Sequence, residues 1–427
     1  MNQKIRLSAV LKAILAGLLI REIFSFWTGH PFDFELWVRL GYYTLKSQNP
    51  YGFLPEVPGL SFSNIFSASA GATIAYLPFW PLITAGIYYS YLLSGVHNRF
   101  FYYFLLKQPI IICDILVAYF IYRYVKDKNP AASEWALLFW LFLPYTIIIS
   151  SIWGMFDSIS VLFVILSLIS TSYKRSFWNG MATFAKSIPV IYMLPISSLK
   201  LRRLFISLAI PILPSLLIFY LTGWSFETIG RTLGSTIIKE GESMSVWEVY
   251  YVANAIGLLK FITPFISNVI GLIWIPAILI VTYLAWKKFG FNSDYGLVQS
   301  LLLITLTFFI FKTRINEQYL LYFLLLAIID IAVWNRGRAK LLYAIVAVAT
   351  LFLVVNNFFM LNFVSPLFPN IISIINMLNQ QIGTARLIVK SILGLLFTIL
   401  NIMYIRLVVR PTFVHDNDPS DVSSPDD

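Results

Sequence analysis

The sequence predicts an all-α, polytopic transmembrane protein. Of its 427 residues, 59% are hydrophobic and only 12% are charged, and the mean hydropathy is +0.78. A soluble protein of this size cannot hide so much apolar surface, so lipid is expected to surround most of the chain. Because every backbone polar group in hydrocarbon needs an internal partner, the long apolar runs indicate helices rather than barrel strands.

The apolar runs divide the chain into about ten to twelve predicted spans. The first span covers roughly residues 7–27, and a long loop rich in Gly, Pro, Ser and aromatic residues follows at 28–75. Loops of that length are usually functional. The remaining apolar runs lie at 74–96, 104–124, 134–152, 158–172, 177–198, 204–223, 264–286, 297–311, 319–334, 341–361 and 386–408. We expect one membrane domain over 1–411, a second outer loop at 224–250, and a disordered acidic cytoplasmic tail at 412–427.

Basic residues indicate the topology. The net charge is +11, and much of the basic charge lies in short loops between apolar runs, which fits the positive-inside rule and anionic headgroups rather than nucleic acid. The N-terminus is then cytoplasmic, in a multi-pass protein of the cell membrane or an endomembrane. If every run crossed, however, Lys126 and Lys174 would both fall outside. The runs 74–96 and 177–198 contain internal prolines, so one or both are expected to be broken or re-entrant.

Two carboxylates follow the first span directly. Asp33 and Glu35 stand in the stretch 29–37 (GHPFDFELW), beside His30 and Trp37. Sugar transfer to a hydroxyl needs a base that takes the acceptor proton, and a positioned carboxylate can serve as that base. In the alternative interpretation Asp33 caps a helix and Glu35 is solvated.

The turn 153–158 (WGMFDS) joins two apolar runs. Trp153 can stack on a sugar ring, and Asp157 can orient a hydroxyl or a lysine; alternatively, Asp157 caps the helix that follows. Lys186 lies between apolar flanks, too far from both ends to reach water comfortably, and Pro189 breaks the helix behind it. Either a phosphate or Asp157 would offset the cost of burying this lysine.

A dense polar turn at 312–319 (KTRINEQY) separates two further runs. Arg314 can hold a phosphate with its forked donors, or it can contact headgroups or pair with Glu317. His30 lacks partners at metal-ligand spacing, and the single cysteine, Cys113, leaves no disulfide or thiolate site. A metal site at His30 is therefore a minor alternative, and a divalent metal is not indicated.

In their order along the chain, these motifs resemble the GT-C superfamily of integral membrane glycosyltransferases. The resemblance is to the polyprenyl-phosphate-sugar-dependent branch, which includes dolichyl-phosphate-mannose-dependent mannosyltransferases and related glucosyltransferases. It covers roughly residues 20–200 and the turn at 312–319, and it rests on the acidic pair, 49–51 (NPY), 76–78 (YLP), 107–109 (KQP) with Asp114, 153–158 and 184–195. Met155 departs from the pattern, since Gln is common at that place, and a crisp Asp-x-Asp pair is missing.

The resemblance implies an inverting transfer of a hexose, with mannose first among the candidates. The donor would be a polyprenyl or dolichyl phosphate sugar, and the acceptor a lipid-linked glycan or glycolipid on the extracytoplasmic face. The implied roles are base for Asp33, second acidic site residue for Glu35, donor-phosphate ligands for Arg314 and Lys186, and sugar or acceptor contacts for Trp153, Asp157, Trp37, Tyr51 and Glu317. This branch generally works without a metal, so the resemblance implies no cofactor.

Two other functions fit the same composition. A transporter or lipid flippase could use Asp114, Asp157 and Lys186 as an intramembrane charge set. It would not need carboxylates in a long outer loop, so it should tolerate Asp33→Asn. A non-catalytic assembly subunit should tolerate the loss of both Asp33 and Arg314.

Overall fold

The computed structural model describes residues 2–63, 74, 76–227, 230, 243–255, 257 and 269–410, and within these ranges it is helical with no strand. The expected tail at 412–427 lies outside the described residues, as do parts of the loops 28–75 and 224–250. The helices are α1 (Asn2–Ser25), α2 (Asp33–Leu45), α4 (Phe79–Leu93), α5 (Arg99–Lys128), η1 (Pro130–Ala132), α6 (Ser133–Phe142), α7 (Pro144–Ile147), η2 (Ile148–Trp153), α8 (Asp157–Ile169), α9 (Ser172–Ala185), η3 (Ile188–Tyr192), α10 (Met193–Ile196), α11 (Leu201–Thr222), α13 (Trp247–Ala255), α15 (Trp274–Phe289), α16 (Asp294–Phe311), η4 (Glu317–Tyr319), α17 (Leu320–Val333), η5 (Arg336–Arg338), α18 (Ala339–Asn356), η6 (Leu361–Val364) and α19 (Ile371–Val409).

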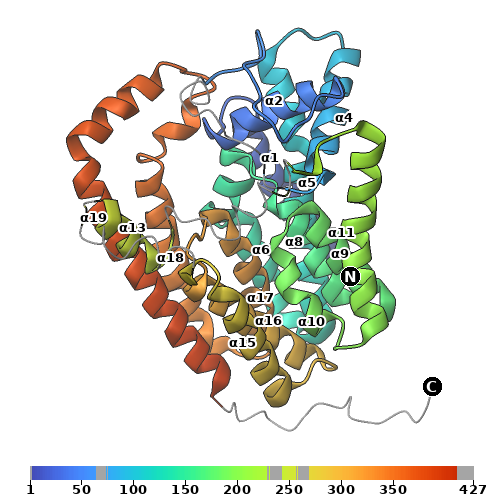
Figure 1. The fold of residues 1–427 in the computed structure, drawn as a ribbon. Coiled ribbons are helices and arrows are strands. Elements are labelled where there is room, and N and C mark those ends of the chain that lie inside the picture. The colour runs from blue at the N-terminus through green and yellow to red at the C-terminus, as the bar shows by residue number, and fades with distance from the viewer. Residues whose placement is uncertain are drawn as a thin grey trace.

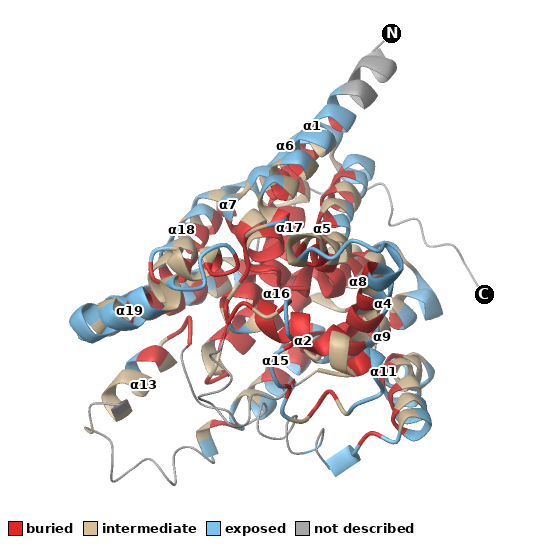
Figure 2. Cartoon of the chain, turned by 90° about the horizontal axis from the view of Figure 1, so that it is seen from above, coloured by how far each residue is buried: buried red, intermediate tan, exposed pale blue. Residues whose placement is uncertain are grey.

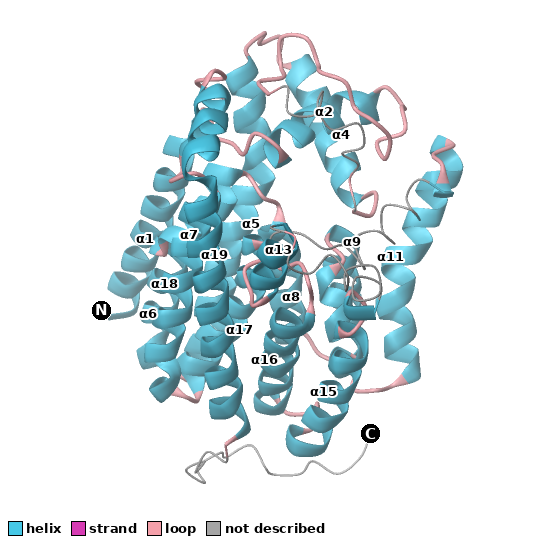
Figure 3. Ribbon diagram, turned by 60° about the vertical axis from the view of Figure 1, so that its left-hand side comes forward, coloured by secondary structure: helices cyan, strands magenta, loops and turns pink. Residues whose placement is uncertain are grey.

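These helices form an all-α bundle with a helical cap across one end (Figure 1). The cap consists of α2 and α4, which lie at the top of Figure 1, while α10, α15 and α16 reach the other end. Figure 3 shows the same cap above the bundle from a second direction. We call the two ends the capped end and the basic end, the latter after the cations described below.

The apolar run 74–96 belongs to the cap and does not cross the bundle. Its helix, α4, packs along α2. Gly41 allows this close packing, because a Cβ atom there would lie 2.7 Å from the carbonyl oxygen of Thr84 on α4. Hydropathy alone could not distinguish this helix from a span, because the cap buries one of its faces as thoroughly as a bundle would.

The run 177–198 turns back on itself. The Ser207 hydroxyl near the start of α11 donates to the Ser176 carbonyl near the start of α9, at 3.1 Å. One turn further along each helix, a Cβ atom on Gly180 would lie 2.7 Å from Cβ of Ile210. The two helices therefore run parallel, and residues 186–200 must return the chain to the end where α9 began. This confirms the expected broken segment and places its break at Lys186, whose backbone is extended (φ −152°, ψ 138°).

The opposite end of the bundle gathers many of the basic residues. Lys128 Nζ lies 2.6 Å from Asp294 Oδ2, and Arg175 lies 3.7 Å from the other oxygen of that carboxylate. Arg338 donates to the Leu407 carbonyl at 2.9 Å and pairs with Asp330 at 2.7 Å. With runs 74–96 and 177–198 removed from the crossings, cations that the sequence seemed to place on opposite sides fall at one end.

Burial is highest at the centre of the bundle and lowest on its outer helices (Figure 2). Nearly every residue of α17 is buried, whereas α11 exposes large apolar side chains such as Tyr220 (81%) and Leu221 (71%). Such exposed apolar faces are typical of a lipid-facing surface.

Among the described residues, five helices are long and apolar enough to cross a membrane, or six if the pair bent by 46° between Phe142 and Pro144 is one span. This count is below the predicted ten to twelve because several runs form helices shorter than 18 residues.

Candidate functional site

A cavity of about 350 Å³ opens at the capped end of the bundle. Four of the residues that the sequence singled out line it together: Asp33, Trp153, Arg314 and Glu317. The other lining residues are His30, Phe32, Ile315, Asn316, Gln318, Phe352, Asn356, Asn357, Phe358, Asn362 and Arg386. Carboxylates, guanidinium groups and side-chain amides thus share one hollow, a mixture suited to a polar, phosphorylated ligand.

Asp33, at the first turn of α2, is held by the Trp153 indole and lies beside His30. The Trp153 indole donates its N–H to Oδ2 of Asp33 at 3.0 Å, and His30 Nδ1 lies 3.5 Å from the same oxygen. Among the described residues, the second oxygen, Oδ1, has no hydrogen-bond partner. The carboxylate is oriented on one side and remains one-fifth exposed (21%), so its second oxygen can accept a hydrogen bond from a ligand in the cavity.

His30, and not Asp33, satisfies the start of α2. Its Nδ1 atom accepts the backbone N–H groups of Phe32 at 3.3 Å and Asp33 at 3.2 Å. A nitrogen that accepts in this way carries no proton, so the neutral ring is protonated on Nε2. The ring stacks on Trp153 with centroids 4.8 Å apart. His30 thereby frees the Asp33 side chain from the capping role that the alternative interpretation gave it.

Backbone hydrogen bonds join the segments that form this wall of the cavity. The His30 N–H donates to the Trp153 carbonyl at 3.2 Å, and the Gly29 N–H donates to the Phe363 carbonyl at 2.8 Å. Behind them, the buried Lys107 ammonium donates to the carbonyls of Thr28 (2.7 Å) and Ser151 (2.6 Å). Lys107 therefore ties together the two chain segments that carry Asp33 and Trp153.

The turn after Trp153 requires its glycine. Gly154 has φ +82°, and a Cβ atom there would lie 2.7 Å from the Phe34 ring. The preceding segment, η2, is a π-helix, a wide turn often found at functional sites. Together these features end the helix abruptly and leave the Trp153 ring beside His30.

Two arginines, Arg314 and Arg386, also line this cavity. The Arg314 Nε atom donates to Asn316 Oδ1 at 3.2 Å, and among the described residues its terminal nitrogens have no partner. Arg386, on α19, donates to the Asn356 carbonyl at 3.0 Å and lies over the Phe358 ring, 4.2 Å from its centroid. Glu317 does not pair with Arg314; it accepts from the Asn356 amide at 2.6 Å. The forked donors of Arg314 are consequently available to an anion.

Strained backbone lies next to Arg386. Phe358, Phe359 and Met360 have φ values of 47°, 54° and 73°, a left-handed run that residues other than glycine rarely adopt. Each such residue costs about 1–3 kcal/mol, and such strain clusters at ligand-binding and active sites. The contact of Arg386 with the Phe358 ring helps to hold this run in place.

Glu35 lies outside the cavity, contrary to its expected role beside Asp33. It is fully buried, and its two oxygens accept from Arg39 Nε at 2.6 Å and from the Phe62 N–H at 2.9 Å. Arg39 in turn donates to the carbonyls of Leu54 and Ser63. Burial raises the pKa of Glu35, against the opposing effect of these donors. The pair braces the loop that follows α2, and the spacing of four residues between its members was visible in the sequence.

Lys186 and Asp157 pair with each other rather than facing the cavity. The Lys186 ammonium donates to Asp157 Oδ2, and both side chains are buried. The rings of Tyr76, Phe156 and Tyr319 surround the ammonium at 4.9–5.6 Å. Of the two partners weighed for Lys186, this geometry favours Asp157 over a phosphate.

Trp37 and Tyr51 are core residues in this structure. Trp37 packs edge-on against Trp80 and Phe156, and Tyr51 packs against Phe219 and Trp224. Both are at most 1% exposed and neither lines the cavity, so their expected contacts with sugar or acceptor do not fit this geometry. Aromatic residues are common both in cores and at sugar sites, so the sequence could not separate the two.

His30, Asn356 and Arg386 line the cavity although no sequence pattern predicted it. His30 was considered as a metal ligand, yet it caps α2 and stacks on Trp153. Arg386 stands alone in the first part of α19, and only the fold brings it to the turn that follows α18. A charged residue within a long apolar helix was the available signal.

Among the described residues, no group of three or more His, Cys, Asp or Glu side chains is placed to hold a metal ion. A scan against protein-family models and a search of curated proteins find no match to this chain.

Proposed function

We propose that this protein is a membrane glycosyltransferase of the GT-C type. It transfers a hexose, with mannose as the first candidate, from a polyprenyl phosphate to a hydroxyl of a lipid-linked glycan or glycolipid. The observation that carries the proposal is that the Asp33 carboxylate and the Arg314 guanidinium line one cavity of about 350 Å³ at the capped end. That volume falls within the range of about 300–1,000 Å³ typical of small-molecule sites.

The chemistry is a single displacement at the anomeric carbon. The acceptor oxygen attacks this carbon while its proton passes to Asp33, and the bond from the carbon to the phosphate oxygen breaks. The lipid phosphate leaves with the bonding electrons. Attack opposite the departing phosphate inverts the anomeric centre.

Asp33 and the arginines have complementary roles in this displacement. Trp153, against which His30 stacks, orients Asp33 before the substrate arrives, which removes the cost of ordering it during the reaction. Arg314 and Arg386 stabilise the negative charge that grows on the leaving phosphate. The five amide side chains in the lining, Asn316, Gln318, Asn356, Asn357 and Asn362, suit the hydroxyls of a sugar.

This function requires the capped end to be extracytoplasmic. The basic end, with Lys128, Arg175 and Arg338, is then cytoplasmic, as the positive-inside rule requires, and so is the N-terminus. The apolar face of α11 would meet lipid, from which a polyprenyl tail can approach.

The transporter alternative has less support. Asp114 is paired with Arg21 at 2.6 Å and accepts from the Trp140 indole at 3.0 Å, while Asp157 is paired with Lys186. Each charge of the set Asp114, Asp157 and Lys186 therefore has its own fixed partner, whereas a transport pathway needs charges that exchange partners.

The test is a transfer assay with purified protein in detergent. The protein receives polyprenyl-phosphate-mannose or polyprenyl-phosphate-glucose together with a membrane lipid extract. We expect transfer from one donor, reduced by about 10²–10⁴-fold in Asp33→Asn. Asp127→Asn, an exposed carboxylate at the basic end, is the matched control and should transfer normally. Absence of transfer from either donor would contradict the proposal.

A further inference from the structure

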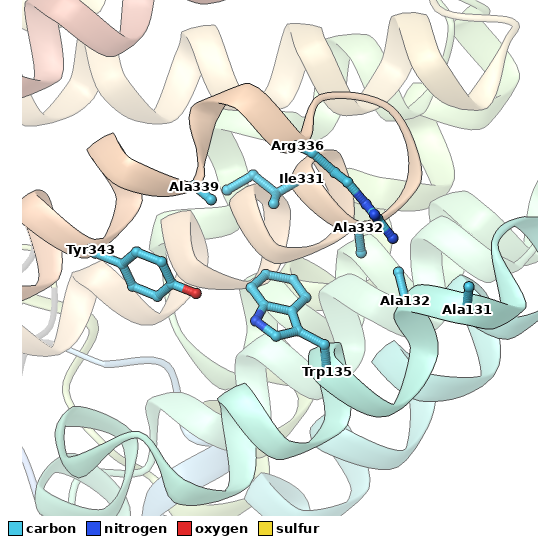
Figure 4. Close-up of a pocket in the computed structure, with 8 residues that line it drawn as sticks. All are labelled: Ala131, Ala132, Trp135, Ile331, Ala332, Arg336, Ala339 and Tyr343. Atoms are coloured by element: carbon cyan, nitrogen blue, oxygen red, sulfur yellow. The ribbon is translucent and has the colours of Figure 1, made fainter.

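A second cavity, of about 390 Å³, lies at the basic end of the bundle. It opens between the turn that joins α5 to α6 and the turn that joins α17 to α18, and the Asn129 amide ties these turns by donating to the Ala332 carbonyl at 2.7 Å. Its lining residues are Ala131, Ala132, Trp135, Ile331, Ala332, Arg336, Ala339 and Tyr343 (Figure 4). The four alanines leave the space that larger side chains would fill.

The walls of this cavity are apolar and aromatic. Trp135 stacks on Phe139 with centroids 5.3 Å apart, and Phe139 lies 5.6 Å from the ring of Tyr343. Tyr343 is 47% exposed. Trp and Tyr are enriched where hydrocarbon meets headgroups, so this wall has the composition of a membrane interface.

Arg336 supplies the cavity with a positive charge. Figure 4 shows its side chain extending from the turn after α17 across Ala332 toward Ala132. Among the described residues its guanidinium has no hydrogen-bond or ion-pair partner, in contrast to the neighbouring Arg338, which is buried and pairs with Asp330. An arginine without a partner at the rim of an apolar hollow can bind a phosphate and place a hydrocarbon chain below it.

We propose that this cavity binds one anionic phospholipid of the surrounding leaflet. The phosphate lies against Arg336, and part of an acyl chain fills the hollow between Trp135, Ala339 and Tyr343. Two observations favour a lipid over a soluble phosphate: most of the lining is apolar, and the hollow lies on the flank of helices long and apolar enough to cross a membrane. Basic pockets between membrane helices on the cytoplasmic side bind anionic headgroups in this way.

The test is native mass spectrometry of the detergent-purified full chain. The protein is titrated with phosphatidylglycerol or with phosphatidylcholine of the same acyl chains. We expect preferential binding of phosphatidylglycerol, weakened about five-fold in Arg336→Gln because one cation near the membrane surface is lost. Ala339→Phe should weaken binding of the lipid by filling the hollow. Lys340→Gln removes an exposed cation that does not line the cavity and should bind as the unmodified protein does.

Several results would overturn this inference. Equal binding of the two lipids, unchanged binding in Arg336→Gln, or an equal loss in Lys340→Gln would remove the specific role of Arg336. Unchanged binding in a folded Ala339→Phe protein would show that no acyl chain enters the hollow. Displacement of the lipid by millimolar glycerol phosphate would assign the site to a soluble phosphate. Because Arg336 is exposed, its replacement should leave the fold intact, and the melting temperature checks this.

Discussion

The indole N–H of Trp153 donates to Oδ2 of Asp33 across 3.0 Å, between residues 120 positions apart in the chain. This bond joins the end of the bent α6–η2 segment to the first turn of the cap. It brings the turn at 153–158 and the stretch 29–37 into one wall. The proposed chemistry depends on that contact, because it holds the carboxylate while leaving its other oxygen for the acceptor.

Trp153→Phe tests this contact. Phenylalanine keeps an aromatic face for His30 but cannot donate to Asp33. We expect kcat to fall about ten-fold or more, since hydrogen bonds to charged groups contribute roughly 1.5–3 kcal/mol. Steady-state kinetics with saturating donor measure the change. Trp178→Phe, a half-buried tryptophan on α9 that stacks on Phe163, is the control, and an equal loss in both variants would contradict the assignment.

Arg386→Gln tests the arginine that the sequence did not identify. Loss of the guanidinium should raise the donor KM about ten-fold, since a charge-assisted bond to phosphate is lost. Arg386→Lys keeps the charge and should recover part of the affinity. Arg406→Gln replaces an exposed arginine on the same helix at the other end and should leave KM unchanged. Equal KM values for Arg386→Gln and the unmodified protein would exclude Arg386 as a phosphate ligand.

Glu35→Gln separates a bracing role from a catalytic one. Breaking the buried pair with Arg39 should lower the free energy of unfolding by about 3–5 kcal/mol. The folded fraction should retain its kcat, because Glu35 does not line the cavity. Thermal unfolding in detergent measures the loss of stability. Kinetics normalised to the amount of folded protein measure kcat. A stable but inactive Glu35→Gln protein would restore Glu35 to the active site.

The lowered pKa of Lys312 predicts that the stability of the protein depends on pH. Burial, and then the charge of Arg314, lower the pKa of Lys312 from 10.5 to about 8. Between pH 8 and 10.5 Lys312 therefore binds more protons in the unfolded chain than in the folded one. The contribution of Lys312 to the free energy of unfolding consequently rises with pH over this range. Lys312→Met should be more stable than the unmodified protein below pH 8, and the difference should shrink toward pH 10.5. Unfolding curves with the same offset at every pH would contradict this.

The sequence predicted the fold class and four of the cavity's lining residues for one physical reason. Asp33, Trp153, Arg314 and Glu317 each lie close to the end of an apolar run, where charged and polar groups are cheap to place. Every helix that crosses a membrane ends at one of its two surfaces. Side chains at the run ends on the same surface can therefore lie close together. Arg386 also stands at the start of the predicted run 386–408, so the same rule applied to it, although its helix begins earlier, at Ile371.

Hydropathy was insufficient where apolar residues are covered by protein rather than lipid. The helix in the run 74–96 lies in the cap, and the run 177–198 breaks at Lys186 and returns. The misplaced cations Lys126 and Lys174 could signal only the first of these, because both precede the run 177–198, in which Pro189 was the signal. The partners of Glu35 and Lys186 depend on tertiary packing, and only the fold could distinguish a buried ion pair from a substrate ligand.

The kinetics of donor use by Asp33→Asn and Arg314→Gln test the central claim most directly. If the two residues act on one phosphosugar, Asp33→Asn should lose kcat at nearly constant donor KM, whereas Arg314→Gln should raise donor KM and also lower kcat. Full activity of Asp33→Asn, or an unchanged donor KM in Arg314→Gln, would contradict a shared site for base and leaving group.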